Sequence, residues 1–182
     1  TKAMNDLGHL NVREPFKNLL TQGMVLHATY KDEAGKWLYP KEAAEMKAKG
    51  ARVIEGKIEK MSKSKNNVVD LESMIANFGA DTARMFALSD SPPEKDLEWS
   101  ENGIEGCYKF ITRLFAMAES LKGVPSAKDE DFAGHELLKQ MHFTIKHVTE
   151  DIQKFRLNKA IARIRELANG LSSTSEQSLV RS

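Results

Sequence analysis

The spacing of apolar residues divides the chain into two halves. From Asp70 onward, apolar positions recur at alternating intervals of three and four residues, which predicts helices that each bury one face. We expect two short helices over 70–79 and 81–89, followed by three longer helices that form a bundle. Their apolar stripes are Ile104, Cys107, Ile111, Leu114, Ala118 and Leu121; then Leu138, Met141, Ile145, Val148, Ile152 and Phe155; then Leu157, Ile161, Ile164, Leu167 and Leu171.

The first half of the chain alternates between shorter apolar runs and turn residues. Runs rich in β-branched and aromatic residues predict strands, and a proline at the start with a glycine at the end favours a short helix. A polar loop rich in lysine follows, over 57–67. The predicted strands are 24–30, 37–39 and 52–56, and the predicted helices are 14–22 and 40–49.

Composition adds few constraints. The 182 residues carry 27 basic and 26 acidic side chains, so the net charge of +1 gives no evidence for a nucleic-acid partner; such contacts would depend on local clusters. The single cysteine, Cys107, excludes an internal disulfide and a multi-cysteine metal site. No apolar run approaches the roughly 20 residues that span a bilayer. We expect a cytoplasmic protein without membrane contact, and the absence of an initial Met suggests an excised fragment.

The strongest chemical signal is the run Lys60-Met61-Ser62-Lys63-Ser64, which lies in a stretch with four lysines and one acid. It resembles, at all five positions, the second signature of class I aminoacyl-tRNA synthetases. The run from Asn77 to Arg84 resembles the segment that follows this loop in those enzymes. The alternative is a solvated lysine loop between two elements, because short motifs also match by chance.

Two further runs narrow the resemblance. Residues 15–25 and the run Leu97-Glu98-Trp99-Ser100, followed by 103–106, resemble bacterial-type leucyl-tRNA synthetases. This resemblance implies a mixed α/β segment, the end of a Rossmann-like catalytic domain, over 1–69, with a short leucine-specific insertion at about 25–52 and the lysine loop at 60–64. It also implies an all-α anticodon-binding bundle over 70–182. The loop 123–133 and a flexible tail, 172–182, lie outside the predicted helices.

The same resemblance implies roles in the activation of leucine by ATP, with Mg²⁺. There an amino-acid carboxylate attacks the α-phosphorus and pyrophosphate leaves, so negative charge develops on phosphate oxygens, where mobile ammonium groups are stabilising. Lys63 and Lys60 are the implied catalytic residues, and Met61, Ser62 and Ser64 complete the implied ATP-binding loop. Lys57 and Lys65 are expected to be solvated only. We expect no metal ligands from this chain.

The first class I signature, His-Ile-Gly-His, is missing from the sequence, so the chain by itself should lack the leucine pocket and be inactive. The parent would be a leucine–tRNA ligase, expected to be a monomer, with tRNA(Leu), ATP and leucine as partners. Two alternatives remain open at this point. One is an isoleucyl, valyl or methionyl synthetase, and the other is a non-catalytic tRNA-binding module.

The helical half carries a candidate tRNA surface of its own. Basic residues outnumber the nearby acids Glu150, Asp151 and Glu166, and a basic flank can bind phosphates without reading bases. An ordinary solvated helix face is an equally good interpretation of any one of them. Trp99 is expected to be a packing residue rather than a base-stacking platform. The basic residues are Lys139, Lys146, Lys154, Arg156, Lys159, Arg163 and Arg165.

Overall fold

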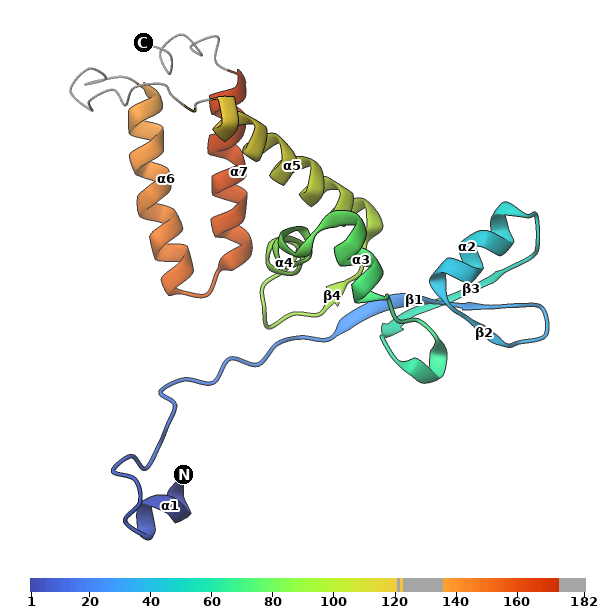
Figure 1. Ribbon diagram of the computed structural model, residues 1–182, viewed down its shortest axis with the longest axis horizontal. Helices are drawn as coiled ribbons and strands as arrows, with labels where there is room; N and C mark the ends of the chain where they lie inside the picture. The colour runs from blue at the N-terminus through green and yellow to red at the C-terminus, as the bar shows by residue number, and fades with distance from the viewer. Residues whose placement is uncertain (121, 123–135, 174–182) are drawn as a thin grey trace.

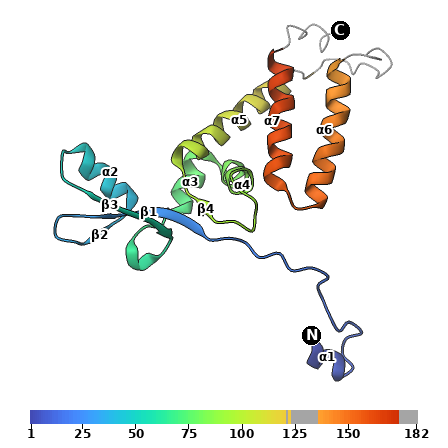
Figure 2. The same cartoon turned by 180° about the vertical axis from the view of Figure 1, so that it is seen from behind.

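The computed structural model describes residues 1–120, 122 and 136–173. The predicted loop 123–133 and the tail from residue 174 onward lie outside the described residues. A small sheet with one helix forms one end of an elongated molecule, and two long paired helices form the other (Figure 1). Seen from behind, the N-terminal part of the chain runs away from the sheet and the helices as a separate arm (Figure 2).

The sheet is organised around β1 (Val25–Lys31). It pairs in antiparallel fashion with β2 (Trp37–Leu38) and β3 (Ile54–Lys60), and in parallel with the short β4 (Leu97–Glu98). The helix α2 (Pro40–Ala48) connects β2 to β3 and begins at its proline, as predicted. The strands at 24–30 and 37–39 are thereby confirmed, whereas β4 was missed because two residues carry no periodic signal.

The third strand extends further than the sequence indicates. Residues 57–60, predicted as loop, pair with β1, so that Lys60 lies opposite Leu26. Between Ala28 and Tyr30 the register shifts, and the hydroxyl of Thr29 donates to the carbonyl of Lys57 over 3.0 Å. A Cβ atom on Gly56 would lie 2.5 Å from that hydroxyl, which explains the glycine at this irregularity.

The N-terminal arm corrects another prediction. It contains the single-turn helix α1 (Lys2–Asp6), but the helix expected over 14–22 is absent and this stretch is irregular. Its apolar residues remain in solvent, with Phe16 82% and Leu19 88% exposed. A short amphipathic helix depends on burial of its apolar face, and here no described element covers that face.

Three helices surround the main apolar core. They are α3 (Leu71–Phe78), α4 (Ala80–Ser89) and α5 (Glu101–Ser120). The side chain of Asp70 caps α3 by accepting from the amides of Glu72 and Ser73, as the sequence predicts. Phe86, Ile104 and Cys107 form the core, against which Trp99 packs edge-on. Cys107 and Trp99 are therefore packing residues, as expected.

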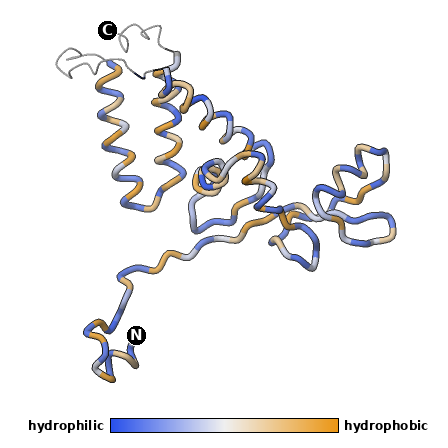
Figure 3. The backbone as a smooth tube through the Cα atoms, in the orientation of Figure 1, coloured by the Kyte–Doolittle hydropathy of each residue, from blue (hydrophilic) through white to orange (hydrophobic). Residues whose placement is uncertain are grey.

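The other two long helices form an antiparallel pair, with α6 (Glu136–Gln153) beside α7 (Leu157–Ser173), and α7 also contacts α4. Apolar and polar residues alternate along all three long helices (Figure 3). The predicted stripes are only partly buried: Ile145, Ile152, Phe155 and Leu114 are exposed. Ser172 and Ser173, assigned to the tail, are the last residues of α7.

Candidate functional site

The lysine loop lies between β3 and α3, below β1 in Figure 1. Lys60 is the last residue of β3, and the amide of Met61 donates to the carbonyl of Val25 over 3.0 Å. Ser62 follows, and Lys63–Lys65 form a single 3₁₀ turn. The loop is thus a tight turn attached to the sheet at its start, not a long open segment.

Asn67 attaches the loop to the sheet at its other end. Its side chain is fully buried, at 0% exposure. Its Oδ1 accepts from the amide of Ser62 over 2.8 Å, while Nδ2 divides its two N–H groups among the carbonyls of His27, Glu59 and Lys60 at 3.2–3.4 Å. One amide side chain therefore ties the loop to both β1 and β3. No local pattern in the sequence indicates this role of Asn67.

Neighbouring residues connect the loop to β2 and β3. Asn66 has the left-handed φ of 53°, a conformation that asparagine tolerates better than most residues, and its Nδ2 donates to the carbonyl of Trp37 over 3.1 Å. Lys65 forms an ion pair with Glu59. The expectation that Lys65 is merely solvated is therefore wrong, because the extended β3 brings a carboxylate within its reach. The asparagine at position 66 is the local feature of the sequence that is compatible with a left-handed turn here.

The remaining loop side chains face solvent. Lys60 and Lys63 are exposed and have no acidic partner among the described residues. Ser62 and Ser64 lie with their hydroxyl oxygens 3.1 Å apart. Met61 is half-buried. The structure thus brings two unpaired ammonium groups and two hydroxyls onto one turn, a combination that can donate to phosphate oxygens.

The basic residues of the helical half separate into two groups. Arg156 and Arg163 bind the two carboxylate oxygens of buried Asp151 at 2.8 and 2.9 Å. Arg165 lies over the Phe110 ring, 5.0 Å from its centroid, and donates to the Cys107 sulfur. These three half-buried arginines already have partners, so they are less available to phosphates than unpaired basic residues.

The lysines form the second group. Lys139 pairs with Glu136 on α6, an exposed contact of the kind that contributes little. Within the described residues, Lys146, Lys154 and Lys159 have no ion-pair partner. Of the basic residues expected to contact tRNA, these three are therefore the ones that remain unpaired within the described part of the chain.

Within the described residues, no three His, Cys, Asp or Glu side chains gather as potential metal ligands. None of the described helices combines the length and the apolar composition needed to cross a membrane.

Comparisons with known proteins agree on one family. The family model for class I tRNA synthetases (I, L, M and V) matches residues 50–100, which include the lysine loop. Leucine–tRNA ligase of Rickettsia africae is 56% identical over 180 residues, covering 94% of this chain and 21% of that protein. That of Rickettsia felis is 52% identical over 186 residues, covering 99% and 22%.

A solved structure supports the same assignment. The LeuRS of Agrobacterium radiobacter, in a ternary complex with tRNA and LeuAMS, superposes with a TM-score of 0.67 and 25% identity, covering 97% of this chain and 20% of that one. The chain spans about a fifth of the length of the curated relatives it matches. These relatives favour the leucyl family over the isoleucyl, valyl and methionyl alternatives. The chain is therefore homologous, over nearly its whole length, to one segment of the leucine–tRNA ligases, the leucyl-tRNA synthetases of class I.

Proposed function

We propose that this chain acts as part of a leucine–tRNA ligase, which uses ATP with Mg²⁺ to activate leucine and then transfers leucine to tRNA(Leu). Residues 1–69 would be the end of the Rossmann-like catalytic domain, with an insertion at about 25–52, and 70–182 the anticodon-binding bundle. The parent is proposed to be a cytoplasmic monomer. Identity above 50% to leucine–tRNA ligases along almost the entire chain supports this assignment.

Within that enzyme, we assign the lysine loop to the ATP phosphates. The observation that carries this assignment is the contrast between Lys63, exposed and without an acidic partner among the described residues, and Lys65, which Glu59 neutralises. Lys63 is the principal cation, with Lys60 assisting at the end of β3. Ser62 and Ser64 supply hydroxyl donors, while Met61 joins the loop to β1 through its amide.

The proposed step requires cations that follow the charge. When the leucine carboxylate oxygen bonds to the α-phosphorus, the bond to the bridging oxygen breaks and pyrophosphate leaves with that electron pair. A flexible ammonium group that contacts pyrophosphate best in the transition state raises the rate more than it raises ground-state affinity. An anchored turn with a free lysine suits this role, since the backbone is held while the side chain moves.

The test uses the full-length synthetase that contains this segment. Lys63→Ala should lower the rate of leucyl-adenylate formation by on the order of 10²–10³, with little change in leucine binding. Lys63→Arg should rescue only partly, because its planar guanidinium donates in fixed directions. Pre-steady-state measurement of adenylate formation checks both.

The matched control is Lys65→Ala, which removes the same charge from the same turn. We expect a much milder effect, because Lys65 is already paired with Glu59. Equal rates for the two alanine variants would show that the loop acts only through its net charge, and would contradict the assignment of Lys63.

A further inference from the structure

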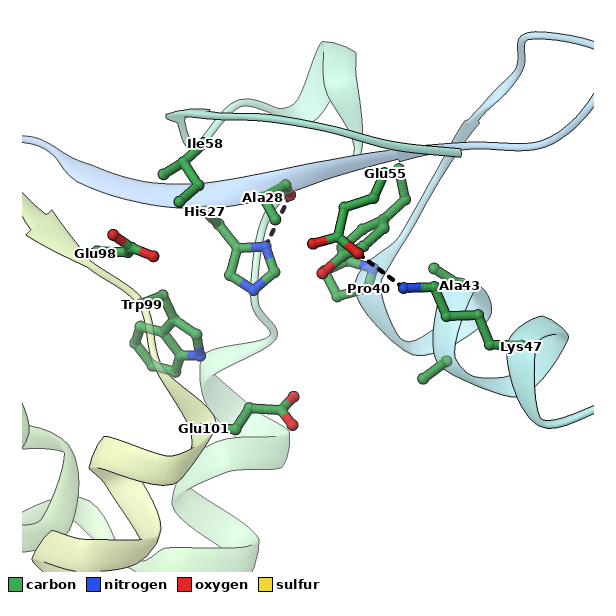
Figure 4. Close-up of a pocket in the computed structure, with 12 residues that line it drawn as sticks. His27, Ala28, Pro40, Ala43, Lys47, Glu55, Ile58, Glu98, Trp99 and Glu101 are labelled. Atoms are coloured by element: carbon green, nitrogen blue, oxygen red, sulfur yellow. Dashed lines mark hydrogen bonds and ion pairs between the residues drawn. The ribbon is translucent and has the colours of Figure 1, made fainter. Parts of the chain in front are cut away.

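A cavity of about 360 Å³ lies between the insertion and the start of α5. His27, Ala28 and Tyr30 of β1, residues of α2, and the junction of β4 with α5 surround it (Figure 4). Within the described chain, its lining includes no residue of the lysine loop. The volume falls in the range of small-molecule sites in proteins. The cavity is therefore a separate feature from the proposed ATP loop.

The charges around this cavity are predominantly negative. Glu55, Glu98 and Glu101 line it together with a single cation, Lys47, whose ammonium lies 2.9 Å from Glu55. Glu98 and Glu101 have no cationic partner among the described residues. Two carboxylates are thus left uncompensated at one opening, which disfavours a phosphate or carboxylate ligand and favours a cation.

A buried histidine supplies an independent indication. His27 is only 7% exposed, and its Nδ1 lies 3.0 Å from the carbonyl oxygen of Ala28. Since a carbonyl can only accept, Nδ1 must carry the proton, and Nε2 of the neutral ring is then an acceptor. Nε2 faces the cavity and has no hydrogen-bond partner among the described residues (Figure 4). A ligand that enters the cavity and donates a hydrogen bond can reach this acceptor.

Aromatic side chains complete the lining. The indole of Trp99 lies along the cavity beside His27 and is held edge-on against Phe86, with ring centroids 5.5 Å apart (Figure 4). Tyr30 also lines the cavity, with its ring centroid 6.3 Å from that of His27, and burial together with the Glu55 carboxylate raises the pKa of its phenol. Aromatic faces next to carboxylates attract organic cations.

We propose that this cavity binds an organic cation, a primary ammonium or guanidinium group, that donates to Nε2 of His27 and is balanced by Glu98 and Glu101. Two sources share this chemistry: a free small amine or guanidine, and a lysine or arginine side chain of a protein. This inference does not depend on the role of the lysine loop. The proposal for the cavity and the proposal for the loop can therefore be tested separately.

The test uses the fluorescence of Trp99 in the 182-residue chain. The sequence contains two tryptophans, so Trp37→Phe leaves Trp99 as the sole emitter, and Trp37 does not line the cavity. n-Butylamine and n-butylguanidine should each change the emission saturably at millimolar concentration, whereas n-butanol and butyrate should not. A blocked tripeptide, Gly-Arg-Gly, distinguishes the two sources of the cation. If it binds more tightly than butylguanidine, the natural ligand is a side chain of a protein. If it binds more weakly, the natural ligand is a free small molecule.

Variants connect the signal to the cavity. Glu98→Gln with Glu101→Gln should weaken binding on the order of tenfold or more, because both charges that balance the cation are lost. Glu72→Gln and Glu94→Gln, at acids that do not line the cavity, should leave binding unchanged in the matched control. Circular dichroism verifies that each variant is folded. Absence of saturable binding, equal responses to butanol, or equal binding by the two double variants would overturn the proposal.

Discussion

At the residue scale, Asn67 has a larger structural role than any lysine of the loop. Its one side chain satisfies the Ser62 amide and contacts three carbonyls of β1 and β3, all without exposure to water. A lysine replaced on the surface loses only a solvated charge, whereas loss of a buried amide leaves several backbone groups unpaired. Positioning of the loop therefore depends on a residue that lies after the recognisable motif.

Asn67→Ala should lower the free energy of unfolding of the chain by about 1–3 kcal/mol, the usual cost of buried groups left unsatisfied. Urea denaturation followed by circular dichroism measures it. Asn66→Gly is the control: glycine accepts the left-handed φ of 53°, so only the bond to the Trp37 carbonyl is lost. If the two variants are equally stable, Asn67 is not the anchor.

At the element scale, the turn between α6 and α7 is closed by a buried ion pair. Asp151 is 2% exposed, and its carboxylate forms ion pairs with Arg156 in the turn and with Arg163 in the first half of α7. The amide of Arg156 also donates to the carbonyl of Asp151 over 2.8 Å. The polar contact lies where the apolar stripe of α6 was expected to continue, and Ile152 beside it is exposed instead.

This contact predicts an acid-sensitive pair of helices. The hydrogen bond from Arg163, together with the charges of Arg156 and Arg163, lowers the pKa of Asp151. A depressed folded-state pKa gives stability that is fully present above the unfolded value of about 3.9 and is lost as pH falls through the lower, folded value. Thermal unfolding should therefore show a decrease in Tm below about pH 4 to which Asp151 contributes.

Asp151→Asn should lower Tm by several degrees at neutral pH and reduce the further loss in acid. Asp81→Asn is the matched control, because Asp81 is exposed and lies 3.5 Å from Arg84 on the surface. A Tm for Asp151→Asn equal to that of the control at neutral pH would contradict a stabilising role for the buried pair.

At the scale of the whole molecule, the acidic cavity and the unpaired lysines of α6 and α7 lie in different parts of the fold. The cavity lies among β1, α2 and the start of α5, whereas the paired helices α6 and α7 lie at the other end of the molecule (Figure 1). Because three of the seven basic residues proposed for tRNA already have partners in Asp151 or the side chains of α5, the remaining lysines can neutralise only a few phosphates.

The purified chain should accordingly bind tRNA weakly, with affinity falling roughly tenfold or more between low and moderate salt. Lys146→Ala, Lys154→Ala and Lys159→Ala combined should remove most of this binding in filter-binding or anisotropy titrations, while Lys2→Ala, Lys17→Ala and Lys49→Ala combined, with the same change in charge, should not. Salt-independent binding would contradict phosphate contact. The same preparation should catalyse no leucine-dependent pyrophosphate exchange.

The sequence by itself determined the elements whose signals are local. Pro40 and Gly50 bracket α2, Asp70 and Gly79 bracket α3, and the 3.6-residue periodicity identified α5, α6 and α7, because caps and periodicity act within a few residues of the chain. The lysine loop was likewise found from five consecutive residues. Its proposed chemistry was inferred from resemblance and not from spacing.

Tertiary structure decided the features that need contact with a residue or element distant in the sequence. Residues 57–60 form a strand because they pair with β1, and Lys65 is paired because β3 places Glu59 beside it. Residues 14–22 are irregular because, in the described part of the chain, no element covers their apolar side chains. The buried face of α6 was likewise set by α7 and Asp151 rather than by its apolar stripe. Hydrogen bonding between strands and burial between helices are long-range interactions, so no local pattern could have specified them.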